Sequence, residues 1–228
     1  MAPNGKQWTA GLPLQQQPHE NVASIIQLVM PALMQAWDEE DDKMTLVVLQ
    51  QELAEALKHV GPALIAEHAD AVNTRVLQVF EGKSFCQQAD LDEEEFGGDE
   101  EDEDQTEYDA MLVSASTDLV GALSVALGPG FAEYFRVYLP HIAKYYAPNK
   151  TASERSMVVG CLGEAAGGLR AGVTEFTETI FTIVVKALQD AEDEVRSNAA
   201  FAIGVLCQHT TLDVTSQYPS VLQALSPL

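Results

Sequence analysis

The sequence contains little that could support catalysis or metal binding. Its three cysteines, Cys86, Cys161 and Cys207, are widely spaced and odd in number. This predicts reduced, mostly buried thiols of a cytosolic or nuclear protein rather than disulfides or metal ligands. The five histidines lack ligand spacing with one another or with cysteine (His19, His59, His68, His141 and His209). Glycine motifs for phosphates or dinucleotides and the hydrolase motif GxSxG are also missing. The sequence therefore predicts no enzyme, no cofactor and no metal site.

Basic residues are scarce as well. There are 12 Lys and Arg against 35 Asp and Glu, a formal net charge of −23. This imbalance favours basic protein partners and disfavours nucleic acid. The sequence shows no signal peptide and no apolar run that we expect to cross a bilayer, so no membrane is predicted as a partner. With 46% hydrophobic residues among 228, the chain can bury a sizeable core.

The clearest pattern lies between Gly172 and His209. Apolar residues recur at helical spacing on both sides of a short polar turn at 189–194, which predicts a helical hairpin. They are Val173, Phe176, Ile180, Phe181, Val184, Ala187 and Leu188, then Val195, Ala199, Ala202, Ile203 and Leu206. The β-branched run 180–185 would also suit a strand, but its length and its period favour a helix.

The hairpin is repeated along the chain. Asp190 in the turn precedes Arg196 by six residues, and Asn149 precedes Arg155 by the same six, 41 residues earlier. Two helices per unit at this period are typical of HEAT or armadillo repeats. A turn Asp and an early-helix Arg fit the HEAT pattern, in which they can form a hydrogen-bonded ladder between stacked units. The prediction is an all-α fold, a right-handed α-solenoid of HEAT repeats.

The chain divides into a short leader and a series of helical pairs. Residues 1–19 are predicted to be a loop or an expression boundary. Helical pairs are predicted at about 20–60, 62–127, 130–171 and 172–209, and a fifth begins at 213–228. Because the last pair stops inside a repeat, we expect a longer solenoid. In the first pair Met44 replaces the ladder arginine. The inward residues expected for its first helix are Val22, Ile25, Ile26, Val29, Leu33 and Ala36.

An acidic loop, predicted at 90–105, interrupts the second pair. The stretch from Asp90 to Asp109 holds 13 of the 35 acidic residues, and no Lys or Arg occurs between Lys83 and Arg136. Self-repulsion predicts disorder, with the next helix starting near Thr106. The ordered pattern of a calcium-binding EF-hand is absent. The residues assigned to the loop are Asp92, Glu93, Glu94, Glu95, Asp99, Glu100, Glu101, Asp102, Glu103 and Asp104.

Two segments carry a resemblance to a known family. EVRSNAAFAIGVL at 194–206 resembles a stretch common in karyopherin-β (importin-β) nuclear import receptors, and SERSMVVGCLGE at 153–164 resembles their importin-4 branch. An acidic insertion within a hairpin fits such receptors. The resemblance covers 20–228 and implies the carboxy-terminal half of a receptor without its amino-terminal Ran-binding repeats. It further implies import of basic cargo such as core histones and ribosomal proteins, release by Ran-GTP, and nucleoporin contacts made by the full-length receptor. Shuttling between cytoplasm and nucleus and a monomeric state are also expected.

The resemblance implies that second helices line a concave, cargo-binding surface. On the last one, Asn198 and Glu194 are off the apolar stripe, and an amide carbonyl with a carboxylate can accept from a lysine ammonium. Alternatively, Asn198 bonds locally and Glu194 merely suits the helix start.

Glu164 is a second candidate for cargo binding. It lies in a helix of small residues, including Gly160, Gly163, Gly167 and Gly168, whose exposed backbone would let an extended chain approach. The same glycines also fit a close helix–helix contact with Glu164 simply solvated. Glu154, Glu52 and Glu55 are candidates for the same surface, with solvated faces as the alternative.

Three functions are compatible with these sequence features. The leading one is an importin segment that binds basic tails on its concave surface and acidic loop. The second is a HEAT scaffold of a phosphatase or chromosome-organising complex, which has no physical need for an acidic loop. The third is a histone-chaperone-like shield, which would bind whole histones more tightly than their tails.

Overall fold

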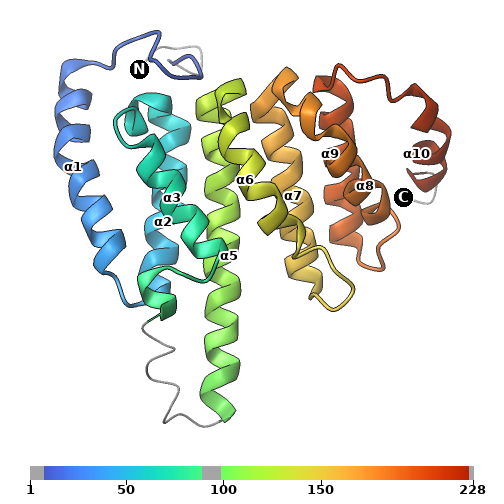
Figure 1. The fold of residues 1–228 in the computed structure, drawn as a ribbon, viewed down its shortest axis with the longest axis horizontal. Helices are drawn as coiled ribbons and strands as arrows, with labels where there is room; N and C mark the ends of the chain where they lie inside the picture. The colour runs from blue at the N-terminus through green and yellow to red at the C-terminus, as the bar shows by residue number, and fades with distance from the viewer. Residues whose placement is uncertain (1–7, 89–98, 226–228) are drawn as a thin grey trace. The chain divides into compact units, whose positions relative to one another are not determined.

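A computed structural model describes residues 8–88 and 99–225 of the chain. These residues form helices and connecting turns and contain no strand, which confirms the all-α solenoid (Figure 1). The α-helices are α1 (Glu20–Glu39), α2 (Lys43–Val60), α3 (Ala69–Phe80), α5 (Asp99–Leu127), α6 (Ala132–Ala143), α7 (Ala152–Leu169), α8 (Thr177–Ala187), α9 (Asp193–His209) and α10 (Tyr218–Leu225). Short 3-10 helices are η1 (Gly61–Ile65), η3 (Gly128–Phe131), η4 (Arg170–Phe176) and η5 (Thr215–Gln217).

The chain forms two compact units, Met1–Ala122 and Leu123–Leu228, which are described separately. In the first unit α1 packs on α2, and α2 ends at Gly61, whose φ of +73° suits glycine. Trp8 lies directly over this glycine, because a Cβ built on Gly61 would stand 2.2 Å from the indole ring. The amino-terminal segment is therefore anchored where α2 stops.

The inward face predicted for α1 is only partly correct: Val22, Ile26 and Leu33 are partly buried. Three of its exposed side chains are Ile25, Val29 and Ala36, whereas Met30, Met34 and Trp37 are buried. The helix is apolar on more than one side, so helical periodicity alone does not choose the buried face. Packing against the rest of the first unit selects the row at i, i+4 and i+7.

Two polar contacts, one of them fully buried, join α2 to α5 in the first unit. Lys43, at the start of α2 and only 6% exposed, lies 3.1 Å from an oxygen of Asp109. Two helical turns further along each helix, Ser116 donates a hydrogen bond of 2.5 Å to the amide oxygen of buried Gln50. These contacts fix α5 against α2 from residue 109 onward.

Helix α5 begins earlier than the sequence predicted. It starts at Asp99 rather than near Thr106, so 99–105 of the expected acidic loop belong to a helix. Glutamate has good helix propensity, carboxylates near a helix amino terminus are favourable, and a formed helix extends at little cost. The helix start predicted near Thr106 therefore lies within α5. Residues 90–98 of the expected loop lie outside the described part of the chain.

One stretch is long and apolar enough, by length and composition, to cross a membrane. It is Thr106–Ala143, whose most apolar window has a mean hydropathy of 1.7, so the expectation of no such run was wrong. However, 72% of that window is buried inside the structure, as in a core helix. The apolar character of α5 is thus used in packing within the fold.

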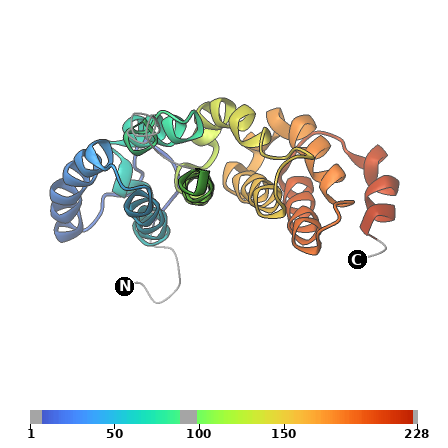
Figure 2. The ribbon, with the colours of Figure 1, turned by 90° about the horizontal axis from the view of Figure 1, so that it is seen from below.

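In the second unit α7 and α9 lie side by side (Figures 1 and 2). All five residues predicted to face inward from α9 are buried: Val195, Ala199, Ala202, Ile203 and Leu206. The opposite side of α7 packs on the carboxyl-terminal part of α5. There a Cβ on Gly168 would stand 2.2 Å from the hydroxyl of Ser124, so only glycine permits this approach. Helix α7 is thus held between two neighbouring helices.

Aromatic residues fill the core beside α6. Phe131, Phe135 and Tyr138 are buried, and the rings of Phe135 and Phe176 meet edge to face with centroids 5.0 Å apart. Tyr134, Tyr145 and Tyr146, which are close to them in the sequence, are only partly buried. Tyr146 instead takes part in a polar network.

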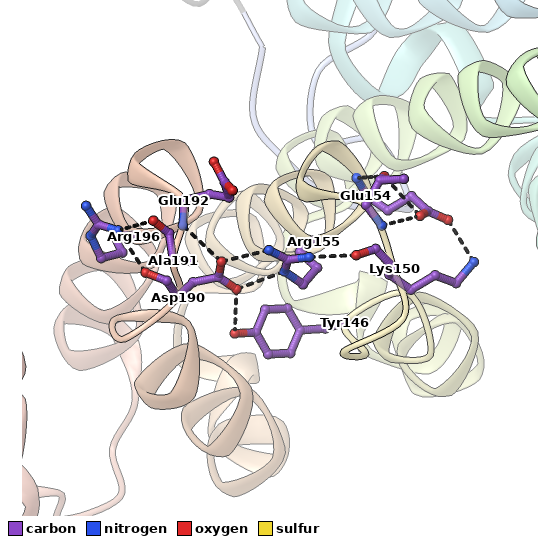
Figure 3. A network of polar contacts seen from close by, with 9 residues as sticks. Tyr146, Lys150, Glu154, Arg155, Asp190, Ala191, Glu192 and Arg196 are labelled. Atoms are coloured by element: carbon purple, nitrogen blue, oxygen red, sulfur yellow. Dashed lines mark hydrogen bonds and ion pairs between the residues drawn. The ribbon is translucent and has the colours of Figure 1, made fainter.

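A polar ladder joins the third and fourth repeats (Figure 3). Arg155 donates to both carboxylate oxygens of Asp190, from Nε and Nη2, each at 2.8 Å. The Tyr146 hydroxyl lies 3.4 Å from the same carboxylate, and burial followed by the nearby Asp190 charge raises the Tyr146 pKa to about 12. The predicted ladder thus forms between neighbouring repeats of the second unit.

The two ladder arginines also bind the turns that precede them. Arg155 donates to the backbone oxygen of Lys150 at 2.6 Å, and Arg196 donates to those of Asp190 and Ala191 at 2.8 Å (Figure 3). Arg196 additionally pairs with Asp193. In each of these two repeats, one arginine thus closes its own turn with backbone hydrogen bonds, and Arg155 also reaches the next repeat.

Candidate functional site

Ser156 connects two of the predicted cargo-binding residues. Its hydroxyl is buried within α7, donates to Glu194 Oε1 at 3.0 Å and accepts from Asn198 Nδ2 at 2.9 Å. Asn198 Nδ2 also donates to the Ser156 backbone oxygen at 3.2 Å. Because Glu194 and Asn198 are one turn apart on α9, they share one face of that helix. The structure therefore brings Glu194 and Asn198 together through a residue of the neighbouring repeat.

Ser156 thus orients two side chains that carry hydrogen-bond acceptors, Glu194 and Asn198. The Asn198 amide nitrogen is occupied by Ser156, while its carbonyl oxygen makes no hydrogen bond within the described residues. Glu194 is exposed and uses one oxygen toward Ser156. A carboxylate and an amide oxygen on one face can share the three donors of an ammonium group. The alternative supposed that Asn198 bonds locally. Its hydrogen bonds instead reach Ser156 on α7.

A row of glycines on α7 lies under a row of side chains on α9. A Cβ on Gly160 would be 3.5 Å from the Asn198 amide nitrogen, and one on Gly167 would be 3.4 Å from Val205. Between them, a Cβ on Gly163 would be 2.9 Å from two ring carbons of Phe201. These contacts support the alternative reading of the glycines, in which they permit close helix–helix packing.

Glu164 is exposed next to this glycine row. Its backbone oxygen accepts a 3.4 Å hydrogen bond from Ser124, so its main chain is part of the contact between α7 and α5. The exposed side chain belongs to the same helix as Ser156, two turns further along. The residue is therefore positioned on the surface of α7 by packing on its buried side.

Glu154 is committed to local structure at the start of α7. Its carboxylate accepts from the Thr151 backbone at 2.8 Å, forming a capping box with Thr151, and lies 2.7 Å from Lys150 (Figure 3). Partial burial opposes ionisation, but the hydrogen bonds from Lys150 and Thr151 outweigh it and lower the pKa of Glu154. A ligand would have to compete with these partners.

Glu52 and Glu55 lie on α2 in the first unit and are exposed. Glu55 contacts Lys58 at 3.1 Å and His59 at 3.0 Å, and the hydrogen bond from Lys58, followed by that from His59, lowers its pKa. Glu55, Lys58 and His59 are at positions i, i+3 and i+4 and so share one face of α2.

The residues assigned to the acidic loop divide into two groups. The backbone of Asp99, Glu100, Glu101, Asp102, Glu103 and Asp104 forms the first turns of α5. Asp92, Glu93, Glu94 and Glu95 lie outside the described residues. Among the residues that the structure describes, no group of three His, Cys, Asp or Glu could hold a metal ion.

Sequence reasoning missed three residues of interest. Ser156 was hidden because a small polar residue in a helix has no distinctive pattern, and its partners are about 40 residues away in the sequence. Phe201 was part of a quoted family segment but was not singled out, although the structure leaves it 52% exposed. On α5, Asp118 has a raised pKa because surrounding protein desolvates it, an effect that nearby Lys58 partly opposes.

Comparison with known proteins agrees with the fold and with the quoted segments. The profile of the HEAT repeat family matches residues 180–210, which span most of α8 and α9. A Schizosaccharomyces pombe protein named "Probable importin subunit beta-4" is 37% identical over 98% of this chain. Proteins named "Importin-4" from Homo sapiens and Mus musculus are 34% and 32% identical over 88% of it. Over nearly its whole length, the chain is similar to a segment of these importins.

The predicted resemblance to the importin-4 branch is thereby confirmed. The chain spans about a fifth of the length of these relatives, 21% of the yeast protein and 18% of each mammalian one. The candidate surface is therefore formed by α7 and α9, two helices from neighbouring repeats. This surface includes the exposed Glu194 and Glu164, the half-buried Asn198 and the exposed ring of Phe201.

Proposed function

We propose that this chain is the part of a nuclear import receptor that binds a basic, lysine-containing segment of a cargo protein. The names of its relatives support transport as the activity. The single observation that carries the binding role is the contact of Ser156 with Glu194 and Asn198. It orients two acceptors on the outer face of α9 before any ligand arrives. Preorganised acceptors bind a cation without a further ordering cost.

The charge of the chain supports the same class of partner. A net charge of −23 attracts basic polypeptides over a distance set by ionic strength. Core histone tails and ribosomal proteins combine many lysines with extended chains and are the proposed cargo. Glu164 is proposed as a third acceptor on α7. Glu154, Glu52 and Glu55 are proposed as secondary acceptors, weakened where Lys150, Lys58 or His59 already occupies the carboxylate.

The proposal for the whole receptor is broader. The full-length protein is proposed to be a monomer that carries basic cargo between cytoplasm and nucleus, contacts nucleoporins and releases its cargo to Ran-GTP. A pull-down from cytosol with the full-length protein, with and without Ran-GTP, tests this. Recovery of basic proteins that Ran-GTP reduces would support it. Recovery of phosphatase or chromosome-organising subunits regardless of Ran-GTP would favour the scaffold, and tighter binding of whole histones than of tails would favour the shield.

The proposed acceptors are tested by binding of a fluorescent core histone tail peptide. A charge-assisted hydrogen bond contributes about 1.5–3 kcal/mol, so Asn198→Ala, Glu194→Gln and Glu164→Ala should each weaken binding about tenfold or more. Ser156→Ala should weaken it too, because Glu194 loses its hydrogen-bond donor and Asn198 keeps only its bond to the backbone oxygen of residue 156. Glu178→Gln on α8 removes the same charge from another exposed position and serves as the control.

The result that would contradict the acceptor assignment is specific. If the Asn198, Glu194 and Glu164 variants all bind the tail as the Glu178 control does, while their circular dichroism is unchanged, the peptide binds elsewhere. A loss of binding shared by the control would instead indicate a diffuse effect of net charge rather than a site.

A further inference from the structure

Phe201 is an exposed aromatic residue in the middle of the candidate surface. Its side chain is 52% exposed, and the other exposed aromatic residue in the described part of the second unit is Tyr218 on α10. A half-exposed phenylalanine is costly to keep in water, because its apolar surface stays hydrated. Its position between Asn198 and Val205 on α9 places it beside the proposed lysine acceptors.

The orientation of the Phe201 ring is fixed from below by α7. A Cβ on Gly163 would be 2.9 Å from ring carbons Cδ1 and Cε1, so the ring rests on the α7 backbone where a side chain is lacking. The same Cβ would be 3.1 Å from the Ala202 Cα, which shows how closely the two helices approach. The ring is therefore supported on one side and open to solvent on the other.

The surroundings of the ring combine apolar surface with acceptors. Asn198 precedes Phe201 by one turn of α9, and Val205 follows by one turn, each over a glycine of α7. Glu164 is exposed directly after Gly163, the residue that supports the ring. An apolar platform flanked by a carboxylate and an amide matches a side chain with a long apolar stem and a cationic end.

We propose that Phe201 is the platform on which the aliphatic stem of a cargo lysine packs while Glu164 accepts its ammonium group. This inference rests on the proposed function, since it concerns the same surface. Lysine buries its methylene groups along apolar surface and keeps its charge at the rim. The negative face of an aromatic ring also attracts the ammonium group. Phe201 thus selects a long aliphatic cation over a short one carrying the same charge.

The test pairs variants of the chain with variants of the peptide. Wild type and Phe201→Ala are titrated with a core histone tail peptide and with one in which each lysine in turn is replaced by diaminopropionic acid. That residue keeps the amine on a stem shortened to one methylene, and because its amine is less basic than that of lysine, all titrations are run at a pH low enough to keep both amines charged. Phe201→Ala should weaken the lysine peptide about fivefold to tenfold, through lost apolar contact and ring attraction. For the peptide shortened at the contacting lysine, the two proteins should bind nearly equally.

A second variant separates apolar contact from ring electrostatics. Phe201→Leu keeps much of the apolar area without the ring, so it should lose about threefold or less. Tyr218→Ala removes an exposed aromatic on α10 and serves as the matched control, with no expected change. Circular dichroism and melting temperature verify that each variant remains folded. Equal affinity of wild type and Phe201→Ala for the lysine peptide would overturn the inference. A fivefold loss that is identical for every shortened peptide would overturn it as well.

The failure of this inference is distinguishable from the failure of the proposed function. If Glu194→Gln and Asn198→Ala weaken the peptide but Phe201→Ala does not, the acceptors hold the cargo and Phe201 is no platform. If none of the three weakens it, the peptide does not bind this surface and both statements fall. Gly163→Ala provides an independent check, because displacing the ring should reproduce the selective loss for the lysine peptide.

Discussion

Asp190 holds two repeats together with a single carboxylate. It accepts from Arg155 of the preceding repeat through both oxygens, and also from the backbone of Glu192 at 3.2 Å. The side chains of Asp190 and Arg155 are 8% and 17% exposed. At this degree of burial, removing one partner leaves an unpaired charge, which is more costly than replacing both with apolar groups. The pair therefore fixes the register of neighbouring repeats more than it adds to stability.

The first prediction concerns the acid stability of this pair. Hydrogen bonds from Arg155 hold the pKa of Asp190 below its ordinary value, although partial burial opposes them. The stabilisation is then fully present above the unfolded pKa, about 3.9, and is lost as pH falls through the lower folded value. Urea midpoints should fall more steeply below about pH 4 for wild type than for Asp190→Asn. Parallel curves, with Glu178→Gln as control, would show that Asp190 contributes nothing to acid sensitivity.

Two glycines of the second unit should respond oppositely to alanine. A Cβ on Gly168 would overlap Ser124, so Gly168→Ala should destabilise the chain by about 1–3 kcal/mol through overpacking. A Cβ on Gly204 would meet nothing within 4 Å, and Gly204→Ala should stabilise by about 0.5–1 kcal/mol through helix propensity. Chemical denaturation measures both. Equal destabilisation by the two substitutions would contradict the close approach of α7 and α5.

At the scale of elements, α5 combines an acidic start with an apolar remainder. Carboxylates in its first turn interact favourably with the helix dipole, while like charges four residues apart repel. From Asp109 onward, Lys43, Gln50 and buried apolar residues hold the helix. The acidic turns from Asp99 are thus attached to a helix that tertiary contacts stabilise independently.

The prediction at this scale concerns the kinetics of the acidic segment. Exposed charges give individually weak, salt-screened contacts but raise encounter rates with a basic partner. Replacing the acidic residues between Asp92 and Asp104 with glutamine should therefore slow cargo association and flatten its dependence on ionic strength. Glutamine keeps good helix propensity, so the start of α5 at Asp99 is preserved. Stopped-flow binding at two salt concentrations measures the effect. A variant that mainly dissociates faster would place this segment in the binding site itself.

For the whole molecule, the repeat architecture predicts local rather than global responses. Stability in a solenoid is approximately a sum of repeat and nearest-neighbour terms. Gly168→Ala should thus accelerate amide hydrogen exchange in α7 and α9 more than in α2, measured by mass spectrometry. Uniform acceleration from α2 to α9 would instead indicate one cooperative unit. Gly204→Ala is the matched variant for the same comparison.

Local sequence pattern was enough to predict an all-α fold, which the helices of the described residues confirm. Helical periodicity, polar turns and the six-residue spacing of Asp190 and Arg196 are local properties, so they are legible without knowing what packs against them. The same holds for the family segments at 153–164 and 194–206, which depend only on residue order. Glu194 and Asn198 could be selected from this information because they lie off the apolar stripe of a predicted helix.

Tertiary structure decided which surfaces meet. The buried face of α1 depended on its neighbours because several of its sides are apolar. The start of α5 at Asp99 depended on the anchoring of its later turns. The contacts of Ser156 with Asn198 and of Gly163 with Phe201 join residues about 40 apart. Local pattern fixes the direction of a side chain from its own helix, but only packing between repeats places a hydroxyl, an amide and a ring at contact distance.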